Sequence, residues 1–474
     1  MFQQDLHIDG EWRSGSTGRR YPVIDPADST EIATFAVASE ADCVAAIRAA
    51  DRALPEWTAT PPRDRSEILR RCFEIMQEEE ERLAEIIVRE NGKAYVDALT
   101  EARYAREFFR WFAEEAVRIR GDFRLSPSGD KRITIVQQGI GVSVLITPWN
   151  FPAAMATRKI APALAAGCTV VLKPASETPL TAAYVIDVMV RAGTPPGVVN
   201  LVVPQPAGPG VQAMLRHPSV RKLSFTGSTE VGRTLLKEAA DYVISSSMEL
   251  GGNAPFIVLP GADIAETVSG AMVAKMRNGG SACTAANRFY VHVSLIEEFT
   301  ERLAEEMGRI TMGPGLTPTN SLGALVSVKE RDKVAALVDR AIEEGAHVRL
   351  GGSPSESGAF FPPTILTNIR HGSHITTNEI FGPVVTLIPF DEVESAIEMA
   401  NDTIYGLIAY VYGPHNEAMT TALRIESGMV GVNRALLSDP AASFGGVKQS
   451  GLGREGGFGG IKEFLEEKYV GSAL

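Results

Sequence analysis

Residues 142–203 read VSVLITPWNFPAAMATRKIAPALAAGCTVVLKPASETPLTAAYVIDVMVRAGTPPGVVNLVV, in which short β-branched runs alternate with longer helical patterns. The expected strands are 142–147, 169–172 and 198–203, and the expected helices are 153–165 and 180–191. Thr178 and Pro179 suit the N-cap and first turn of the second helix. Strands that alternate with helices form a mostly parallel sheet covered on both faces. The stretch therefore predicts an α/β fold.

The same alternation continues on both sides of this stretch. Residues 39–120 are helical in pattern, with Ser39 as N-cap, and residues 132–138 form a strand before the quoted stretch. A second alternating block follows Gly251 and Gly252. It contains expected strands at 256–259, 289–293, 384–388 and 408–412, with helices at 264–277, from 297 and at 328–344. A further strand expected at 222–225 belongs to the first block. Two α/β domains are expected, followed by a glycine-rich stretch, a short helix and a last strand at 469–470.

Composition and charge exclude several classes of protein. The 474 residues are 45% hydrophobic and 22% charged, which is typical of folded globular chains. Lys plus Arg number 46 against 58 Asp plus Glu, so the net charge of −12 has the wrong sign for binding nucleic acid. Residues 160–172, the longest nearly apolar run, fall short of the ~20 residues that span a bilayer. We expect no nucleic-acid partner and no membrane segment.

Four scattered cysteines and the N-terminal sequence indicate the compartment. The cysteines fit neither a C-x-x-C metal site nor a disulfide framework, and the first residues lack the features of a signal peptide. A reducing, cytoplasmic location is expected. His371 and His374 have no further ligand at zinc spacing, so no metal site is expected either.

One cysteine differs from the other three in its neighbours. Cys283 follows Asn-Gly-Gly-Ser-Ala, and these small residues leave room for a substrate to approach the sulfur. Cys43, Cys72 and Cys168 lie inside apolar patterns typical of buried structural cysteines. A lone cysteine is more often structural than catalytic. Of the four cysteines, only Cys283 is kept as a candidate nucleophile.

Polar residues at strand ends supply the other candidates. Asn150 follows a strand in Thr-Pro-Trp-Asn-Phe-Pro, where its amide could donate to an oxyanion, although two prolines can also build a plain turn. Glu249 ends a β-run before Gly-Gly, where acidic residues are commonly solvated. Residues 225–232 combine strand, glycine turn and helix, an arrangement that binds phosphate. The G-x-G-x-x-G at 451–456 follows no strand and is rejected as a nucleotide motif.

Together these motifs resemble the aldehyde dehydrogenase superfamily over essentially the whole chain. The series comprises Pro148–Pro152, Lys173–Pro179, Phe225–Ser228, Glu249–Gly252, Cys283, Glu379–Pro383 and Asn401–Leu407. Within the superfamily, residues 248–258 and 444–456 look like succinate-semialdehyde dehydrogenases. The family often has Gln at the position of Ser281. Some members have a second cysteine two residues after the nucleophile, but this chain has Ala285 there, so a disulfide within this loop is not available.

The resemblance implies NAD(P)-dependent oxidation of an aldehyde to an acid through a thiohemiacetal and a thioester. Cys283 would attack the carbonyl, and Asn150 with the Cys283 backbone N–H would hold the oxyanion. Glu249 would activate water for hydrolysis of the thioester. Two alternatives from other classes stay open, namely a catalytically silent binding or structural member and an acylating enzyme that passes the thioester to coenzyme A.

The resemblance also implies the cofactor residues. They are Thr147, Pro148, Trp149, Lys173, Ser176, Glu177, Phe225, Gly227, Ser228, Leu250, Glu379 and Phe381. Relatives that prefer NAD often have Glu at the position of Ser176, where a carboxylate binds the ribose and repels a 2′-phosphate. NADP is therefore expected to be accepted and preferred over NAD.

Three further residues match positions that bind the distal carboxylate in succinate-semialdehyde dehydrogenases. They are Arg158, Arg277 and Ser438. The expected substrate is a small anionic aldehyde, first succinate semialdehyde, with glutarate semialdehyde or a sulfonated aldehyde as alternatives of similar reach.

The family fold implies two Rossmann-like domains and a small β-flap through which subunits pair. Residues 1–119 and 140–250 would form the NAD(P)-binding domain and residues 251–440 the catalytic domain. Residues 120–139 and 441–474 would bridge subunits in a homodimer or homotetramer.

Overall fold

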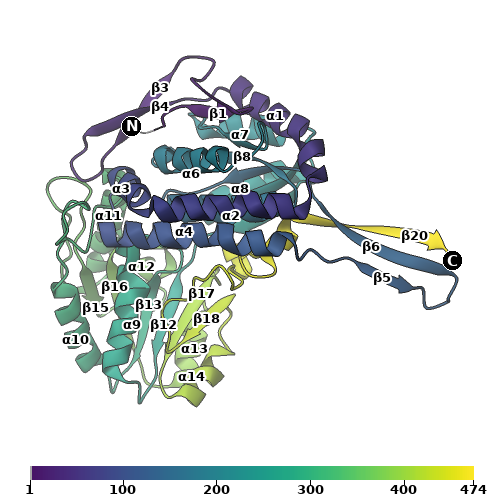
Figure 1. The fold of residues 1–474 in the computed structure, drawn as a ribbon. Coiled ribbons are helices and arrows are strands. Elements are labelled where there is room, and N and C mark those ends of the chain that lie inside the picture. The colour runs from purple at the N-terminus through teal and green to yellow at the C-terminus, as the bar shows by residue number, and fades with distance from the viewer. Residues whose placement is uncertain (1–2) are drawn as a thin grey trace.

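The first sheet of the computed structural model, which describes residues 3–474, carries the quoted stretch (Figure 1). Its eight strands lie in the order β19-β11-β10-β7-β8-β9-β1-β2. The five parallel strands are β7 (Val142–Ile146), β8 (Thr169–Lys173), β9 (Val199–Leu201), β10 (Val220–Thr226) and β11 (Ser245–Glu249). The antiparallel edges are β1 (Leu6–Ile8), β2 (Glu11–Arg13) and β19 (Gly451–Leu452). The chain order reverses between β7 and β10, which makes their carboxyl ends a topological switch point.

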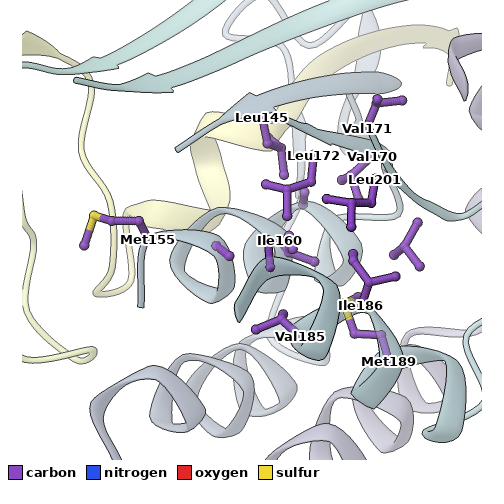
Figure 2. Packing of buried hydrophobic residues seen from close by; sticks show 14 of the residues in the cluster. Leu145, Met155, Ile160, Val170, Val171, Leu172, Val185, Ile186, Met189 and Leu201 are labelled. Carbon is purple, nitrogen blue, oxygen red and sulfur yellow. The ribbon is translucent and has the colours of Figure 1, made fainter. Parts of the chain in front are cut away.

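Helices cover both faces of this sheet. One side carries α5 (Pro152–Ala165) and α6 (Pro179–Arg191), and the other carries α1 (Glu40–Ala59), α7 (Ala207–Leu215) and α8 (Thr229–Ala240). Figure 2 shows Leu145 and Leu172 of the sheet packed with Ile160 of α5 and Val185 of α6, all fully buried. Each such side chain contributes about 1.5–3 kcal/mol by its burial. The core on this face therefore holds the loops at the strand ends in place.

A second helical layer lies outside α5 and α6. It is formed by α2 (Pro62–Glu78), α3 (Glu80–Asn91) and α4 (Tyr95–Ala116), of which α2 and α4 run side by side across the body (Figure 1). The turn between α3 and α4 contacts the loop that follows β7, through Asn91 and Lys93.

The second sheet has seven strands in the order β14-β15-β16-β13-β12-β17-β18. They are β12 (Ala254–Val258), β13 (Ala286–His292), β15 (Thr364–Thr367), β16 (Val384–Phe390), β17 (Ile408–Tyr412) and β18 (Met429–Val432), all parallel, with β14 (His347–Leu350) antiparallel at one edge. Its helices are α9 (Ile264–Met276), α10 (Ile296–Gly308), α11 (Val328–Glu343), α12 (His374–Thr377), α13 (Val393–Asn401) and α14 (His415–Ala422). Two apolar clusters fill the sheet's two faces.

A three-stranded antiparallel sheet projects away from the body (Figure 1). It pairs β20 (Leu465–Ala473) with β6 (Lys131–Gly139), and β6 with β5 (Asp122–Leu125). The small β-flap expected from the family is therefore present. A separate hairpin joins β3 (Arg20–Ile24) to β4 (Glu31–Ala36), and short 3₁₀ turns lie at Arg277–Gly280, Lys448–Ser450 and Gly460–Phe464.

The α/β class is confirmed, and several local expectations are corrected. Thr178 is the N-cap residue of α6, but its side chain makes no capping bond. Glu90 of α3 instead accepts from the backbone N–H groups of Leu180 and Thr181, at 2.7 and 2.8 Å. The strand expected at 198–203 is limited to β9, and the short C-terminal helix is a 3₁₀ turn. Ser39 caps α1 through a capping box, as its pattern predicts.

No helix within residues 3–474 is long and apolar enough to cross a membrane.

Candidate active site

The candidate site lies where the carboxyl edge of the first sheet meets the amino edge of the second. β11 ends at Glu249, and the chain crosses through Gly251 and Gly252 to the start of β12. Cys283 precedes β13, and Phe381 precedes β16, so both lie at the amino ends of strands in the second sheet. The facing edge of the first sheet contains the switch point between β7 and β10. Both sheets therefore contribute loops to one place.

Cys283 lies in the loop between the 3₁₀ turn and β13 and keeps partial solvent access, unlike the three other cysteines. Burial raises the pKa of its thiol to about 12, while the positive charges of Arg158 and Arg277 act in the opposite direction. A Cβ atom at Gly252 would lie 2.4 Å from the Cys283 carbonyl oxygen. Only glycine allows the turn between the sheets to pack this closely against the cysteine loop.

Asn150 lies beside the cysteine loop and is buried. Its side-chain Nδ2 donates to the Ser281 carbonyl oxygen at 3.1 Å, and its Oδ1 has no hydrogen-bond partner among the described residues. A side-chain amide has two N–H groups, so one remains after the bond to Ser281. The arrangement leaves one amide N–H of Asn150 free to donate, in a side chain that is bonded to the loop two residues before Cys283.

Glu249 is buried at the end of β11, with Oε2 unpartnered in the part of the chain that the structure describes. Burial raises the pKa of this carboxyl well above its ordinary value, and the nearby carboxylate of Glu455 raises it further. Lys159 forms an ion pair with Glu455 and donates to the Ser224 hydroxyl at 2.9 Å, so its charge partly opposes the shift. A carboxylate whose pKa is raised is a stronger base toward water.

Several buried polar atoms near this edge have no hydrogen-bond partner within residues 3–474. They include Thr147 Oγ1, Asn150 Oδ1, Thr226 Oγ1, Glu249 Oε2 and Asn253 Oδ1. The large majority of buried polar atoms in proteins are hydrogen-bonded, so a cluster of unpartnered ones indicates where a ligand binds. Thr147 and Thr226 lie at the switch point between β7 and β10, and Glu249 ends the neighbouring strand β11.

Arg158 and Arg277, both expected to bind a substrate carboxylate, lie close enough to Cys283 for their charges to act on its thiol, but they have different neighbours. Arg277 and Ser438 line one pocket together with Ala282 and Thr284, the two neighbours of Cys283. Arg158 is not among the lining residues of that pocket. It is buried, donates to the Tyr104 hydroxyl at 2.6 Å and lies 4.1 Å from the Phe444 ring centre.

The residues expected to bind the adenosine end of the cofactor lie at the carboxyl ends of β8 and β10. Lys173 ends β8, is 9% exposed, and has no ion-pair partner among residues 3–474. Burial lowers the pKa of its ammonium group. Ser176 is half-buried, with its carbonyl oxygen accepting from Tyr21, whereas Glu177 and Ser228 are exposed. Gly227 precedes Ser228, whose hydroxyl caps α8.

The remaining expected cofactor residues surround the turn between the sheets. Trp149 meets the Phe381 ring edge to face, with centres 5.3 Å apart. Glu379 accepts from the Gly252 N–H at 3.1 Å, and burial raises its carboxyl pKa to about 7. The others, buried or half-buried around them, are Thr147, Pro148, Phe225 and Leu250. The expected cofactor residues therefore gather along one edge that leads to Cys283.

His371, one of the two histidines not expected to bind a metal, lies between a tyrosine and an aspartate. His371 hydrogen-bonds to the Tyr290 hydroxyl at 3.1 Å and to the Asp402 carboxylate at 3.0 Å.

A family model described as "Aldehyde dehydrogenase family" matches residues 12–470. The chain belongs to the aldehyde dehydrogenase family. The family predicted from the motif series is thereby confirmed, and the protein is an oxidoreductase.

Three relatives of this aldehyde dehydrogenase are similar over nearly the whole chain. The succinate-semialdehyde dehydrogenase of Paenarthrobacter nicotinovorans is 47% identical, with 93% of this chain and 99% of that protein covered. The glutarate-semialdehyde dehydrogenase of Pseudomonas putida is 44% identical, with 99% and 98% covered. A crystal structure described as an E. coli NADP-dependent enzyme has a TM-score of 0.98 and 43% identity, with 100% and 98% covered.

Sequence reasoning missed several polar residues around the site of this aldehyde dehydrogenase. Lys159 is fully buried within α5, all of whose residues are buried, and Glu455 pairs with it from the glycine-rich stretch. Lys93 and Asn278 both donate to the backbone carbonyl of Asn150. Two adjacent charges inside an otherwise apolar helix were the signal that could have revealed Lys159.

Proposed function

We propose that this aldehyde dehydrogenase oxidises an aldehyde with a distal anionic group and that its substrate is succinate semialdehyde. The pocket shared by Arg277 and Ser438, beside the two neighbours of Cys283, is the observation that carries this proposal. A guanidinium binds a carboxylate through charge-assisted hydrogen bonds, whereas an apolar aldehyde would leave it unpaired. The names of the bacterial relatives, with succinate and glutarate semialdehydes as substrates, agree with such a pocket.

The protein groups around Cys283 have separate tasks. The Cys283 thiolate adds to the carbonyl carbon, and the resulting oxyanion is held by the Asn150 amide and the Cys283 backbone N–H. A bound nicotinamide would supply the hydride acceptor, and loss of hydride from that carbon would leave a thioester on Cys283. Glu249 takes a proton from water, whose oxygen attacks the thioester. The C–S bond breaks, and the acid and the free thiolate are released.

The residues at the carboxyl ends of β7, β8 and β10 fit an NAD(P) molecule. Lys173 is a buried ammonium without an ion-pair partner among the described residues, which suits ribose hydroxyls or a phosphate. The exposed N-terminus of α8 at Ser228 offers backbone N–H groups to a diphosphate. Glu379 and Phe381, on the Cys283 side, suit the nicotinamide ribose.

We expect NADP to be preferred over NAD. Ser176 and Lys173 would meet the 2′-phosphate, and the Ser176 backbone is held by the Tyr21 hydroxyl at 3.0 Å. Ser176→Glu places a carboxylate against that phosphate and should lower kcat/KM with NADP relative to NAD by roughly tenfold or more, since a charge-assisted contact contributes about 1.5–3 kcal/mol. Steady-state kinetics with both cofactors measure the ratio. Equal or better kinetics with NAD, unchanged in Ser176→Glu, would reject this preference.

Arg277→Ala tests the substrate. Loss of one charge-assisted hydrogen bond costs about 1.5–3 kcal/mol, so kcat/KM for succinate semialdehyde should fall by roughly 10- to 150-fold. Butanal has a similar chain length and no carboxylate, so its kcat/KM should remain nearly unchanged. Initial rates of NADPH formation with the two aldehydes give the comparison.

A matched control and a contradicting outcome accompany this variant. Arg302→Ala removes an exposed arginine that pairs with Glu298 on α10, and it should leave both aldehydes unaffected. An equal loss for succinate semialdehyde and butanal in Arg277→Ala would mean that Arg277 supports the cysteine loop, for example through Thr284 and Phe151, and does not bind the substrate's charge.

Glutarate semialdehyde and sulfonated aldehydes carry an anion at similar reach, so the same panel ranks them against succinate semialdehyde. Omitting coenzyme A separates hydrolysis from acyl transfer, because only acyl transfer needs it. Turnover should continue without coenzyme A, since the Glu249 carboxylate suits activation of water. A silent binding member would produce no NAD(P)H with any of these aldehydes.

We further propose that residues 1–119 and 140–250 bind the cofactor, that residues 251–440 form the catalytic domain, and that residues 120–139 and 441–474 join subunits into a homodimer or homotetramer. The projecting sheet supports this assembly because Phe123 and Leu125 of β5 expose large apolar side chains. A monomer in light scattering would contradict it.

The four unpaired cysteines agree with a cytoplasmic location.

A further inference from the structure

The loop that carries Asn150 is held by its backbone carbonyls. Asn91 Nδ2, at the end of α3, donates to the Trp149 carbonyl at 2.8 Å. Lys93 Nζ, two residues further along, donates to the Asn150 carbonyl at 2.7 Å. Two consecutive peptide groups of the loop are therefore bound by one turn, more than fifty residues away in sequence.

Lys93 is also paired with a carboxylate that holds the following helix. Its Nζ lies 2.6 Å from Glu101 Oε2, and both side chains are almost completely buried. The other oxygen of Glu101 accepts from the backbone N–H groups of Ala153 and Ala154, at 2.9 and 3.3 Å. The N-cap residue of α5, Phe151, supplies no side-chain cap, so Glu101 takes that place. One ion pair thus binds the chain on both sides of Phe151.

Asn278 connects the same carbonyl to the cysteine loop. Its Nδ2 donates to the carbonyls of Asn150 and Ser281, each at 2.9 Å. Asn278 has φ of 56°, a left-handed conformation that bends the chain ahead of Cys283. The Asn150 side chain donates to the same Ser281 carbonyl. The position of the Asn150 amide relative to Cys283 therefore depends on donors to the Asn150 backbone.

We propose that Lys93 is a positioning residue, which holds the Asn150 backbone so that the free N–H of its amide points at the oxyanion. This inference rests on the proposed oxyanion role of Asn150. Removal of an oxyanion donor costs about 10²–10³ in kcat, and a misplacement of ~1 Å can cost about 10². Loss of the Lys93 donor alone leaves Asn278 on the Asn150 carbonyl, so the expected loss is about 10- to 100-fold.

The test measures single-turnover NADPH formation in Lys93→Met, alone and combined with Asn150→Ala. Lys93→Met keeps the length of the side chain and removes its charge and donors. A second form, Lys93→Met with Glu101→Gln, removes the charge of the partner carboxylate together with that of the lysine and keeps an acceptor for the α5 amides. It carries the test if Lys93→Met alone does not fold. Lys222→Met is the control, since Lys222 is equally buried and pairs with Glu463 away from Asn150.

If Lys93 acts through Asn150, Lys93→Met slows NADPH formation by about 10- to 100-fold in the wild-type background and less than about threefold in Asn150→Ala. The dissociation constant for NADP stays unchanged, and Lys222→Met keeps the wild-type rate. The same fold loss in both backgrounds, or no loss in either, overturns the proposal. Butanal is used alongside succinate semialdehyde, so a wrong substrate assignment shows as a difference between aldehydes and not between variants.

Discussion

Cys283→Ala is expected to abolish aldehyde oxidation with every aldehyde and either cofactor. In the proposed mechanism its sulfur forms the bond to the substrate carbon, and the three other described cysteines are buried. Single catalytic groups contribute about 2.7–4 kcal/mol, so even a supporting role predicts a loss of roughly 10²–10³ in kcat, and loss of the nucleophile itself a larger one. Steady-state NAD(P)H formation measures the effect. Retention of more than about a hundredth of the wild-type kcat would contradict the assignment.

The remaining cysteines supply the controls for this variant. Burial raises the pKa of Cys43 to about 12, as it does for Cys283, so the thiol pKa does not distinguish the two. The two cysteines differ in solvent access and in the arginine charges that lie near Cys283. Cys43→Ala and Cys168→Ala should change stability more than turnover, and Cys283→Ala should keep the wild-type dissociation constant for NADP. Loss of cofactor binding in Cys283→Ala would point to a collapsed loop.

Glu249→Gln is expected to stop the reaction at the thioester. Glutamine keeps the shape of the side chain but cannot take a proton from water, and general-base catalysis typically contributes about 10²–10⁴-fold. A burst of NAD(P)H close to one equivalent per site should therefore persist, while steady-state turnover falls by roughly that factor. Rapid mixing with succinate semialdehyde measures both phases. A burst lost in parallel with turnover would place Glu249 in deprotonation of the Cys283 thiol.

The pH dependence gives a second measurement on the same variant. Burial and the charge of Glu455 raise the pKa of Glu249, so the carboxylate that accepts the proton forms only as the pH rises through that higher value. Wild-type kcat should rise with pH over that range, and Glu249→Gln should lack the rise. A rise that persists in the variant would assign it to another group, such as the thiol.

The loops of the candidate site could be predicted because their signals are local. Asn150, Gly227 and Glu249 each lie at or just after the end of an expected strand, and the turn chemistry after a strand is visible within a few residues. The alternation of strand and helix then brings these strand ends to one edge. The sequence and the family resemblance therefore predict which strand ends carry the candidate base and oxyanion donor.

Other elements depend on partners far away in sequence. β20 is exposed over most of its length and shows no alternating pattern, and only its pairing with β6 makes it a strand. Glu90 replaces the expected cap at Thr178 from a different helix. Periodicity reports which face of an element is apolar, but it does not report which distant polar group arrives there.

The same limit applies to charged residues of the site. Arg158 and Arg277 both match positions of the expected carboxylate site, and the charges of both act on the Cys283 thiol. Arg277 lines the pocket beside Cys283, whereas Arg158 also donates to Tyr104 and lies against the Phe444 ring. Lys93 contacts Asn150 only because α3, α4 and the loop after β7 pack together. Side-chain direction and tertiary packing decide these cases, and neither is visible in spacing.

We propose above all that the chain oxidises an anionic semialdehyde by hydrolysis of a Cys283 thioester. The most direct measurement is kcat/KM of the wild-type enzyme for succinate semialdehyde and for butanal, from NADPH absorbance without coenzyme A. A guanidinium bond of about 1.5–3 kcal/mol predicts that succinate semialdehyde is favoured by roughly 10- to 150-fold and that turnover is sustained. Equal values for the two aldehydes, or no NADPH until coenzyme A is added, would contradict the account.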